Sequence, residues 1–179
     1  GGVFYSNAME ELSNFAIKHN IPVTQTVMGY STMKRDHTHY AGQIGGLGGK
    51  NTNDLAKETD LAIAVGTKLA DFTTGSWANF ENENFKLLSI NVSRFDANKH
   101  LAQAVVGDAK VSLIELSKAL GEWKASDDWN KKSQRELKIW NEHIDKESAP
   151  TNQEIPSYIQ VIGAVYRLSL IHISEPTRR

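Results

Sequence analysis

The sequence contains no cysteine, few prolines and no long apolar run. Without cysteine, neither a disulfide framework nor a thiolate metal site can form. No apolar stretch approaches the roughly 20 residues that a helix needs to cross a bilayer. An excess of one charge is also missing, since 20 basic residues stand against 21 acidic ones. The sequence therefore gives no reason to expect a nucleic acid or an anionic membrane as a partner.

The rest of the composition is that of an ordinary globular chain. Hydrophobic residues make up 40% of the sequence and charged residues 23%, which are usual proportions for folded domains. A length of 179 residues is enough for one domain with a sizeable core.

Both ends of the sequence indicate a piece of a longer protein. It opens without Met on Gly1-Gly2-Val3, which is typical of the turn after a strand. Eleven residues near the end, Leu168–Arg178, match the translation of a common transposase sequencing adapter. We therefore expect the protein's own sequence to stop at Arg167 and the rest to be an adapter-derived tail. The alternative is an ordinary C-terminal strand, because Leu170–Ile173 alternates acceptably.

Short apolar runs that end at small or polar residues are typical of buried parallel strands. The clearest are Asp60–Val65 and Lys86–Val92, with weaker ones at 21–26 and 104–106. Helices are expected at 7–19, where Asn7 is a candidate cap, at 51–58, and from Asp108 to Gly121. The segments 29–42 and 71–84 are expected to be mostly loop, the second with Trp77 and Phe80 as packing anchors. Strands that alternate with helices predict an α/β fold with a doubly wound, Rossmann-like parallel sheet.

The last expected helix of this sheet has a predicted apolar face made of Val111, Ile114, Leu116 and Leu120. After Gly121 the sequence becomes rich in Lys and Glu. The predicted domains are therefore 1–121 as the sheet domain, 122–155 as a helical linker and 156–167 as the start of another domain. The linker helix, 123–147, is expected to pack through Trp129, Leu137, Trp140 and Ile144, and Ser157 is a candidate cap of the last helix.

A glycine run, Gly45-Gly46-Leu47-Gly48-Gly49, precedes a predicted helix. Glycines let a backbone approach a phosphate closely, and N–H groups at a helix start favour an anion. Gly45, Gly48 and Gly49 are therefore candidate cofactor-binding residues. The run is neither the dinucleotide-binding glycine fingerprint nor a Walker loop. A flexible connecting loop is the alternative interpretation.

Gly66, Thr67 and Asn91 stand where two predicted strands end. Ligands of open α/β sheets bind at that edge, so these residues are also candidates for cofactor binding. The alternative is that they only terminate the strands. Asp71 and Asp96 lie on different loops and are interpreted as solvated acids.

The histidines suggest no metal site. His37 and His39 lie two apart without a helical spacing or a Glu companion. His100 and His143 are expected to be surface residues, and His172 lies in the predicted tail and carries no functional meaning.

Several segments resemble the trihydroxycyclohexane-dione hydrolases, a family of thiamine-diphosphate enzymes of inositol breakdown. The resemblance is carried by Gly1–Ser6, Asp71–Thr74, Leu88–Ser93, Asp96–Lys99 and Pro156–Val165. It implies that 1–121 is the central domain of a three-domain enzyme and that 156–167 begins the thiamine-binding domain.

The resemblance also implies a reaction. Thiamine diphosphate, held through Mg²⁺, would supply the carbanion chemistry that opens a small cyclic dione and releases 5-deoxyglucuronic acid. The Glu that activates thiamine and the Gly-Asp-Gly motif that holds Mg²⁺ would lie in the other domains, so no catalytic residue and no metal ligand is expected in this sequence. A cytoplasmic homo-oligomer is implied, with neither nucleic acid nor membrane as partner.

Acetolactate synthases share the pattern of residues 19–26, and in them the matching domain binds FAD. Three departures speak against FAD here. Gly48-Gly49-Lys50 stands where those enzymes favour His-Gly-Thr, Leu69–Phe72 replaces an acidic-Arg loop, and Asn91 replaces an Asp. A residual nucleotide site stays open. An acetolactate-synthase-type domain and a stand-alone nucleotide-binding module remain alternatives.

Overall fold

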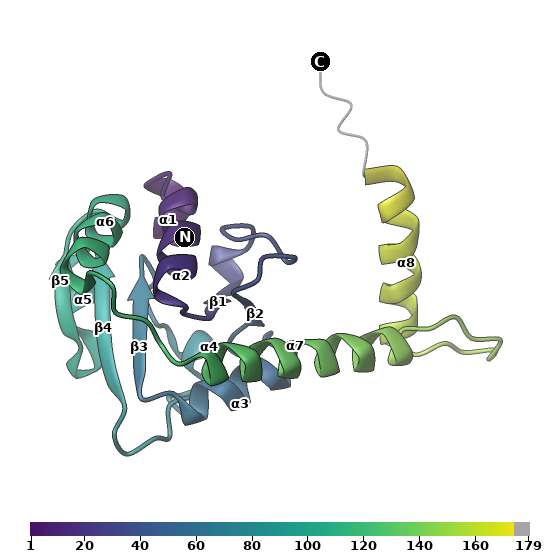
Figure 1. The fold of residues 1–179 in the computed structure, drawn as a ribbon. Coiled ribbons are helices and arrows are strands. Elements are labelled where there is room, and N and C mark those ends of the chain that lie inside the picture. Colours follow the sequence, from purple (N-terminus) through teal and green to yellow (C-terminus); the bar gives the residue numbers. More distant parts are fainter. Residues whose placement is uncertain (174–179) are drawn as a thin grey trace. The chain divides into compact units, whose positions relative to one another are not determined.

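A computed structural model describes the backbone of residues 1–173 and side chains up to Leu168 (Figure 1). The chain divides into two compact units, Gly1–Leu137 and a second one that starts at Lys138. The boundary falls inside one helix, α7 (Asp127–Glu147).

The first unit is built on parallel strands. Two of them form one sheet, β1 (Val23–Gln25) beside β2 (Tyr40–Gln43). The other three form a second sheet in the order β3 (Leu61–Val65), β4 (Lys86–Asn91) and β5 (Gln103–Val106). All three pairings in these sheets are parallel. The prediction of an α/β fold with parallel strands is thus confirmed, and among the described residues the strands are divided between two sheets.

The connections between strands contain the helices α3 (Lys50–Glu58), α4 (Asp71–Thr74) and α5 (Arg94–Ala97) and the 3₁₀ turns η1 (Val27–Gly29) and η2 (Lys99–Leu101). Before β1 come α1 (Gly2–Tyr5) and α2 (Met9–His19), and β5 is followed by α6 (Ala109–Leu120). A parallel pair needs such crossovers, because consecutive strands must start at the same edge of the sheet.

The larger core forms where α2 packs on α6. Leu12, Phe15 and Leu113 are buried there, and Val23 of β1 and Ile63 of β3 pack against the same cluster. Both sheets therefore share one core.

The opposite face of β3 and β4 is covered by loops. Ala64, Leu69 and Leu87 are buried on that face, with Trp77 packed against them. The ring of Phe80 lies 5.1 Å from that of Trp77, which confirms the predicted aromatic anchors.

Two local predictions are wrong. The segment 29–42 contains the start of β2, which is only four residues long and includes a glycine, so it has no clear apolar pattern. Asn7 does not cap α2. Its backbone is left-handed, with φ of 50°, and Ala8 occupies the N-cap position without a side-chain bond.

The predicted capping of α6 is confirmed at both ends. The Asp108 carboxylate accepts hydrogen bonds from the N–H groups of Lys110 and Val111. Gly121, with φ of 58°, follows the last turn. Such a cap satisfies N–H groups that the first helical turn leaves without partners.

The predicted apolar face of α6 is partly wrong. Leu113 is 1% exposed, whereas Val111 is 60% exposed and Ile114 is also exposed. Leu116 and Leu120 do pack against the core, as predicted. Leu113, Leu116 and Leu120 follow helical spacing, while Val111 and Ile114 belong to another face of the same helix.

The second unit contains the end of α7 and α8 (Tyr158–Ile173). The predicted Ser157 cap is confirmed, because Gln160 N donates to Ser157 Oγ over 3.4 Å and Ser157 N donates to Gln160 Oε1 over 2.8 Å. This reciprocal pair is a capping box. Residues 174–179 of the predicted adapter tail lie outside the described residues, and the origin of 168–179 stays a prediction.

Candidate functional site

The carboxyl ends of β3 and β4 form the candidate site. Gly66 follows β3, with φ of 59°. Its N–H donates to Ile90 O over 2.8 Å, and its carbonyl accepts from Gly2 N over 2.8 Å. A Cβ at Gly66 would lie 2.5 Å from Gly2 Cα. Only glycine fits here, for reasons of both backbone conformation and space.

Asn91, at the end of β4, ties the two neighbouring loops together. Its Nδ2 donates to Thr67 O over 3.0 Å, and its Oδ1 accepts from Ser93 N over 2.9 Å. The structure thus brings Gly66, Thr67 and Asn91 together, as the strand pattern predicted. Both polar atoms of the buried Asn91 amide are already used within the protein, so its clearest role is to hold the loops in place.

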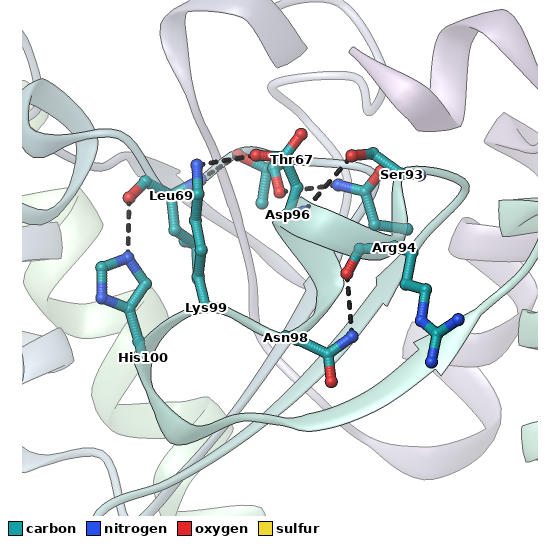
Figure 2. Close-up of polar contacts among 9 residues, drawn as sticks. Thr67, Leu69, Ser93, Arg94, Asp96, Asn98, Lys99 and His100 are labelled. Atoms are coloured by element: carbon teal, nitrogen blue, oxygen red, sulfur yellow. Dashed lines mark hydrogen bonds and ion pairs between the residues drawn. The ribbon is translucent and has the colours of Figure 1, made fainter.

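The loop after β4 carries an ion pair that the sequence interpretation missed. Lys99 Nζ lies 2.7 Å from Asp96 Oδ1, and the Asp96 side chain is only 12% exposed. Figure 2 shows Thr67, Ser93, Asp96 and Lys99 gathered at this edge. The interpretation of Asp96 as a solvated acid is therefore wrong. The three-residue spacing of Asp96 and Lys99 was the available signal.

The electrostatics of this loop follow from that pair. The Lys99 ammonium lowers the pKa of Asp96 by donating a hydrogen bond, and Ser93 and the charge of Lys68 lower it further against the opposing effect of desolvation. Lys99 also lies over the Phe95 ring, 4.9 Å from its centroid. This loop therefore holds Lys99 in a fixed position, between the Asp96 carboxylate and the Phe95 ring.

The glycine run is closed by its own hydrogen bonds. Gly45 N donates to Asn53 Oδ1 over 3.0 Å, and Asn53 Nδ2 donates to Gly45 O over 3.1 Å. The N–H groups of Gly46, Gly48 and Gly49 donate to carbonyl oxygens of Phe72, Gly45 and Gln43, respectively. None of these four N–H groups is free to face a phosphate.

Close packing explains the glycines of this run equally well. A Cβ at Gly48 would lie 2.4 Å from Gln43 O, and one at Gly45 would lie 2.6 Å from Phe72 O. Gly45 also has φ of 104°. The anion-binding role of Gly45, Gly48 and Gly49 stays a prediction. The structure places these glycines beside α4, apart from the two hydrogen bonds that Asn91 makes with Thr67 and Ser93, which we call the Asn91 bridge.

His39 and His19 each make a hydrogen bond within the protein through a ring nitrogen. His39 Nε2 lies 3.1 Å from Asn20 Oδ1, and burial, followed by the charge of His37, lowers the pKa of His39. The buried His19, which sequence reasoning did not single out, contacts Trp123 O through Nδ1 at 2.7 Å. In the described part of the chain, no group of three or more His, Cys, Asp or Glu could hold a metal ion.

His100 is exposed, as predicted, but it is also held in place. Its ring stacks on Trp77 with centroids 4.2 Å apart. Its Nε2 lies 3.2 Å from Leu69 O, as Figure 2 shows. The two rings line a shallow hollow of about 480 Å³ together with Phe80 and Phe85. It lies where β4 begins, away from the Asn91 bridge.

Within residues 1–173, no helix is both long and apolar enough to span a membrane.

Comparisons with known proteins agree with this architecture. Curated relatives named 3D-(3,5/4)-trihydroxycyclohexane-1,2-dione hydrolase include one from Clostridium perfringens (strain 13 / Type A), 44% identical over 120 residues, which are 67% of this chain and 19% of the relative. The one from Bacillus cereus (strain AH820) is 44% identical over 122 residues, 68% of this chain and 19% of the relative. The one from Bacillus thuringiensis (strain Al Hakam) is 45% identical over 116 residues, which are 65% of this chain and 18% of the relative.

The chain thus spans about a fifth of the length of the curated relatives that it matches. The family model described as thiamine pyrophosphate enzyme, central domain, matches residues 1–116. This match covers the two parallel sheets, the glycine run and the Asn91 bridge, and the chain belongs to the thiamine pyrophosphate enzyme family through its central domain.

Proposed function

We propose that the chain is the central domain of a hydrolase that opens the ring of trihydroxycyclohexane-1,2-dione to give 5-deoxyglucuronic acid in myo-inositol breakdown. The observation that carries this proposal is the 44% identity to relatives named for that activity, over two thirds of this chain. In the proposal the enzyme is cytoplasmic and a homo-oligomer, and its substrate is a small cyclic dione.

The described residues offer no group of three or more His, Cys, Asp or Glu that could hold the metal of thiamine diphosphate. Asp108, the acidic residue beside Gly107, is used to cap α6. When bound, thiamine diphosphate supplies the carbanion chemistry. We therefore assign the cofactor and Mg²⁺ to other parts of the full-length enzyme and expect this chain alone to be inactive.

The domain division follows the same proposal. Residues 1–121 form the central domain, 122–155 link it onward, 156–167 begin the thiamine-binding domain and 168–179 are the tail. A strand preceding Gly1 would lie between β1 and β3, at the sides of these strands that have no partner among the described strands. Val23 and Ile63 pack on a common cluster, and Gly2 contacts Gly66 at the carboxyl end of β3. The added strand would join both sheets into one.

Any residual nucleotide site would lie at the ends of β3 and β4, lined by Gly66, Thr67 and Asn91. We expect weak or no ADP binding, because both polar atoms of the Asn91 amide are engaged. FAD is not expected, because the sequence departs from the acetolactate-synthase pattern at 48–50, 69–72 and Asn91.

The test is to express the full-length gene and measure dione consumption with and without thiamine diphosphate and Mg²⁺. Turnover should require both additions, and the 179-residue chain should show none above a no-protein control. Full-length protein that is folded but inert toward the dione would refute the assignment.

Flavin absorbance in the purified full-length protein, with formation of acetolactate, would favour the acetolactate-synthase type. A gene that ends near residue 167 would favour a stand-alone nucleotide-binding module. ADP binding by a chain extended before Gly1 would leave the hydrolase assignment standing and add a nucleotide site.

A further inference from the structure

The outer side of β5 is an uncovered edge of the three-stranded sheet. Among the described strands β5 pairs with β4 alone (Figure 1), and none of its four residues is buried. Val105 is 37% exposed and Val106 is 52% exposed. Between Lys99 and Asp108 the sequence contains no Lys, Arg, Asp, Glu or Pro. Charged residues and proline are what usually keep an edge strand from pairing with another chain, so this edge is open to association.

Leu101, in the turn η2 just before β5, is held outside the protein. It is 102% exposed, and its backbone is left-handed, with φ of 56°. A leucine in this conformation is strained, and backbone strain of this kind clusters at binding sites and switch regions. The neighbouring His100 is also left-handed but stacks on Trp77, whereas Leu101 gains no burial in the described part of the chain. A partner that covered Leu101 would supply the missing burial.

An apolar hollow that can receive a leucine lies beside Leu101. It is the hollow of about 480 Å³ at the start of β4, which we call the aromatic hollow. Its lining includes Trp77, Phe80 and Phe85, all partly buried, and residues 100–103 of η2 and β5. The same surface thus carries an exposed apolar side chain and an apolar hollow. A two-fold interface needs such a self-complementary patch, because each copy must offer both halves of the contact.

The charges around the aromatic hollow are of both signs. Among the described residues that line it, Lys86 is the one with a formal charge, and Asp60 and Glu83 lie beside Lys86. Two further lysines nearby are in ion pairs within the chain, Lys57 with Glu81 and Lys99 with Asp96. Repulsion between like charges therefore does not set two copies of this face against each other.

We infer that two copies of this chain associate through a two-fold face, with Leu101 of each copy in the aromatic hollow of the other and the two β5 edges side by side. The occupant is a second copy because the face contains both the side chain to be buried and the hollow that would bury it. A small ligand in the hollow would leave Val105 and Val106 uncovered. The inference deepens the proposed function, on which it rests for the expectation of a homo-oligomer, by naming the surface that joins the copies.

The test is sedimentation velocity of the 179-residue chain over a range of concentrations, with circular dichroism to show that each variant is folded. The parent chain should change from monomer to dimer as its concentration rises. Leu101→Ala should raise the dimer Kd at least about tenfold, because both copies lose the buried leucine. Leu47→Ala is the matched control. Leu47 is 65% exposed but follows β2, so this variant should keep the parent Kd.

Val105→Lys tests the strand edge itself. It places one positive charge of each copy on β5, which should also raise the Kd at least about tenfold. Its control is Val27→Lys, because Val27 is similarly exposed, at 42%, but follows β1 in the other sheet. The control should leave the Kd unchanged.

A chain that stays monomeric at every concentration would overturn the inference. Association that neither Leu101→Ala nor Val105→Lys weakens would also overturn it, because the copies would then meet elsewhere, for example along the open sides of β1 and β3. Dione turnover by the full-length enzyme reports on the proposed function separately. An active enzyme whose 179-residue chain is monomeric refutes only this interface. A dimer that both variants weaken, from an enzyme without dione turnover, refutes only the hydrolase assignment.

Discussion

At the scale of single residues, Asn91 shows how one side chain can tie two loops together at the edge of a sheet, while its role in cofactor binding stays a prediction. The amide bonds the loop after β3 through Thr67 and the loop after β4 through Ser93. The strand pattern located this residue correctly, because apolar strands that end in polar residues mark the carboxyl edge. Its actual partners could not be predicted, since they depend on how the two loops turn.

Replacing Asn91 with Ala should destabilise the domain by about 1–3 kcal/mol, the usual result of leaving buried polar partners unsatisfied. The measurement is chemical denaturation of the variant and the parent chain. The control is Asn98→Ala, because Asn98 is exposed and bonds only within its own turn, to Arg94 O. A loss no larger than that of the control would show that the bridge contributes little.

A second residue-scale prediction concerns pH. Burial, followed by the charge of His37, lowers the pKa of His39 below its ordinary value of 6.5. Between that value and the lowered one, the unfolded chain binds more protons than the folded chain, so stability falls as the pH drops through this window. Above it, the contribution of His39 is fully present.

His39→Gln should therefore make the free energy of unfolding less dependent on pH between about 7.5 and 5. Gln keeps a donor that can reach Asn20 Oδ1. The exposed His143→Gln serves as the control and should retain the parent pH profile. An unchanged profile in His39→Gln would show that another group governs the acid sensitivity.

At the scale of elements, most helices and strands were predictable, and the misses have physical causes. β3 and β4 are apolar runs bounded by turn signals, so periodicity identifies them. β2 has no such pattern and depends on pairing with β1. The two ends of α6 were predicted correctly, because Asp108 and Gly121 end the helix through contacts with its own first and last turns. The buried face of α6 was not, because it depends on packing against α2, which the sequence does not show.

The Asp108 cap gives an element-scale prediction. Asp108→Ala should cost about 1 kcal/mol, because two N–H groups of α6 lose their acceptor. Asp108→Asn keeps a capping oxygen and should cost much less. Thermal melts of both variants test this, and equal losses would indicate that the charge, rather than the cap, stabilises the helix start.

At the scale of the whole molecule, the chain belongs to the thiamine pyrophosphate enzyme family. It divides between Leu137 and Lys138 into two compact units. The predicted linker, 122–155, stays a prediction, and the boundary between the two compact units falls within it. Gln134 donates to Tyr40 O over 3.0 Å, and Lys132 pairs with Glu58. These polar contacts join positions over 70 residues apart, which a local pattern cannot reveal.

Deleting residues 168–179 should leave the melting temperature within error or raise it. An adapter-derived tail has not been selected to pack against the protein. A melt of the 1–167 chain beside the full 179 residues tests this, with deletion of 156–179 as a comparison that also removes the capping box of α8. A drop of several degrees on removing 168–179 alone would show that the tail is structural.

The contact between Gly2 and Gly66 has a practical consequence for anyone who produces this protein. The N-terminal amine of Gly1 is partly buried, and burial lowers its pKa. The next residue is already bonded to the carboxyl end of β3. Purification tags fused before Gly1 would therefore begin at a partly buried amine beside the carboxyl end of β3. Tags are better placed after Arg167.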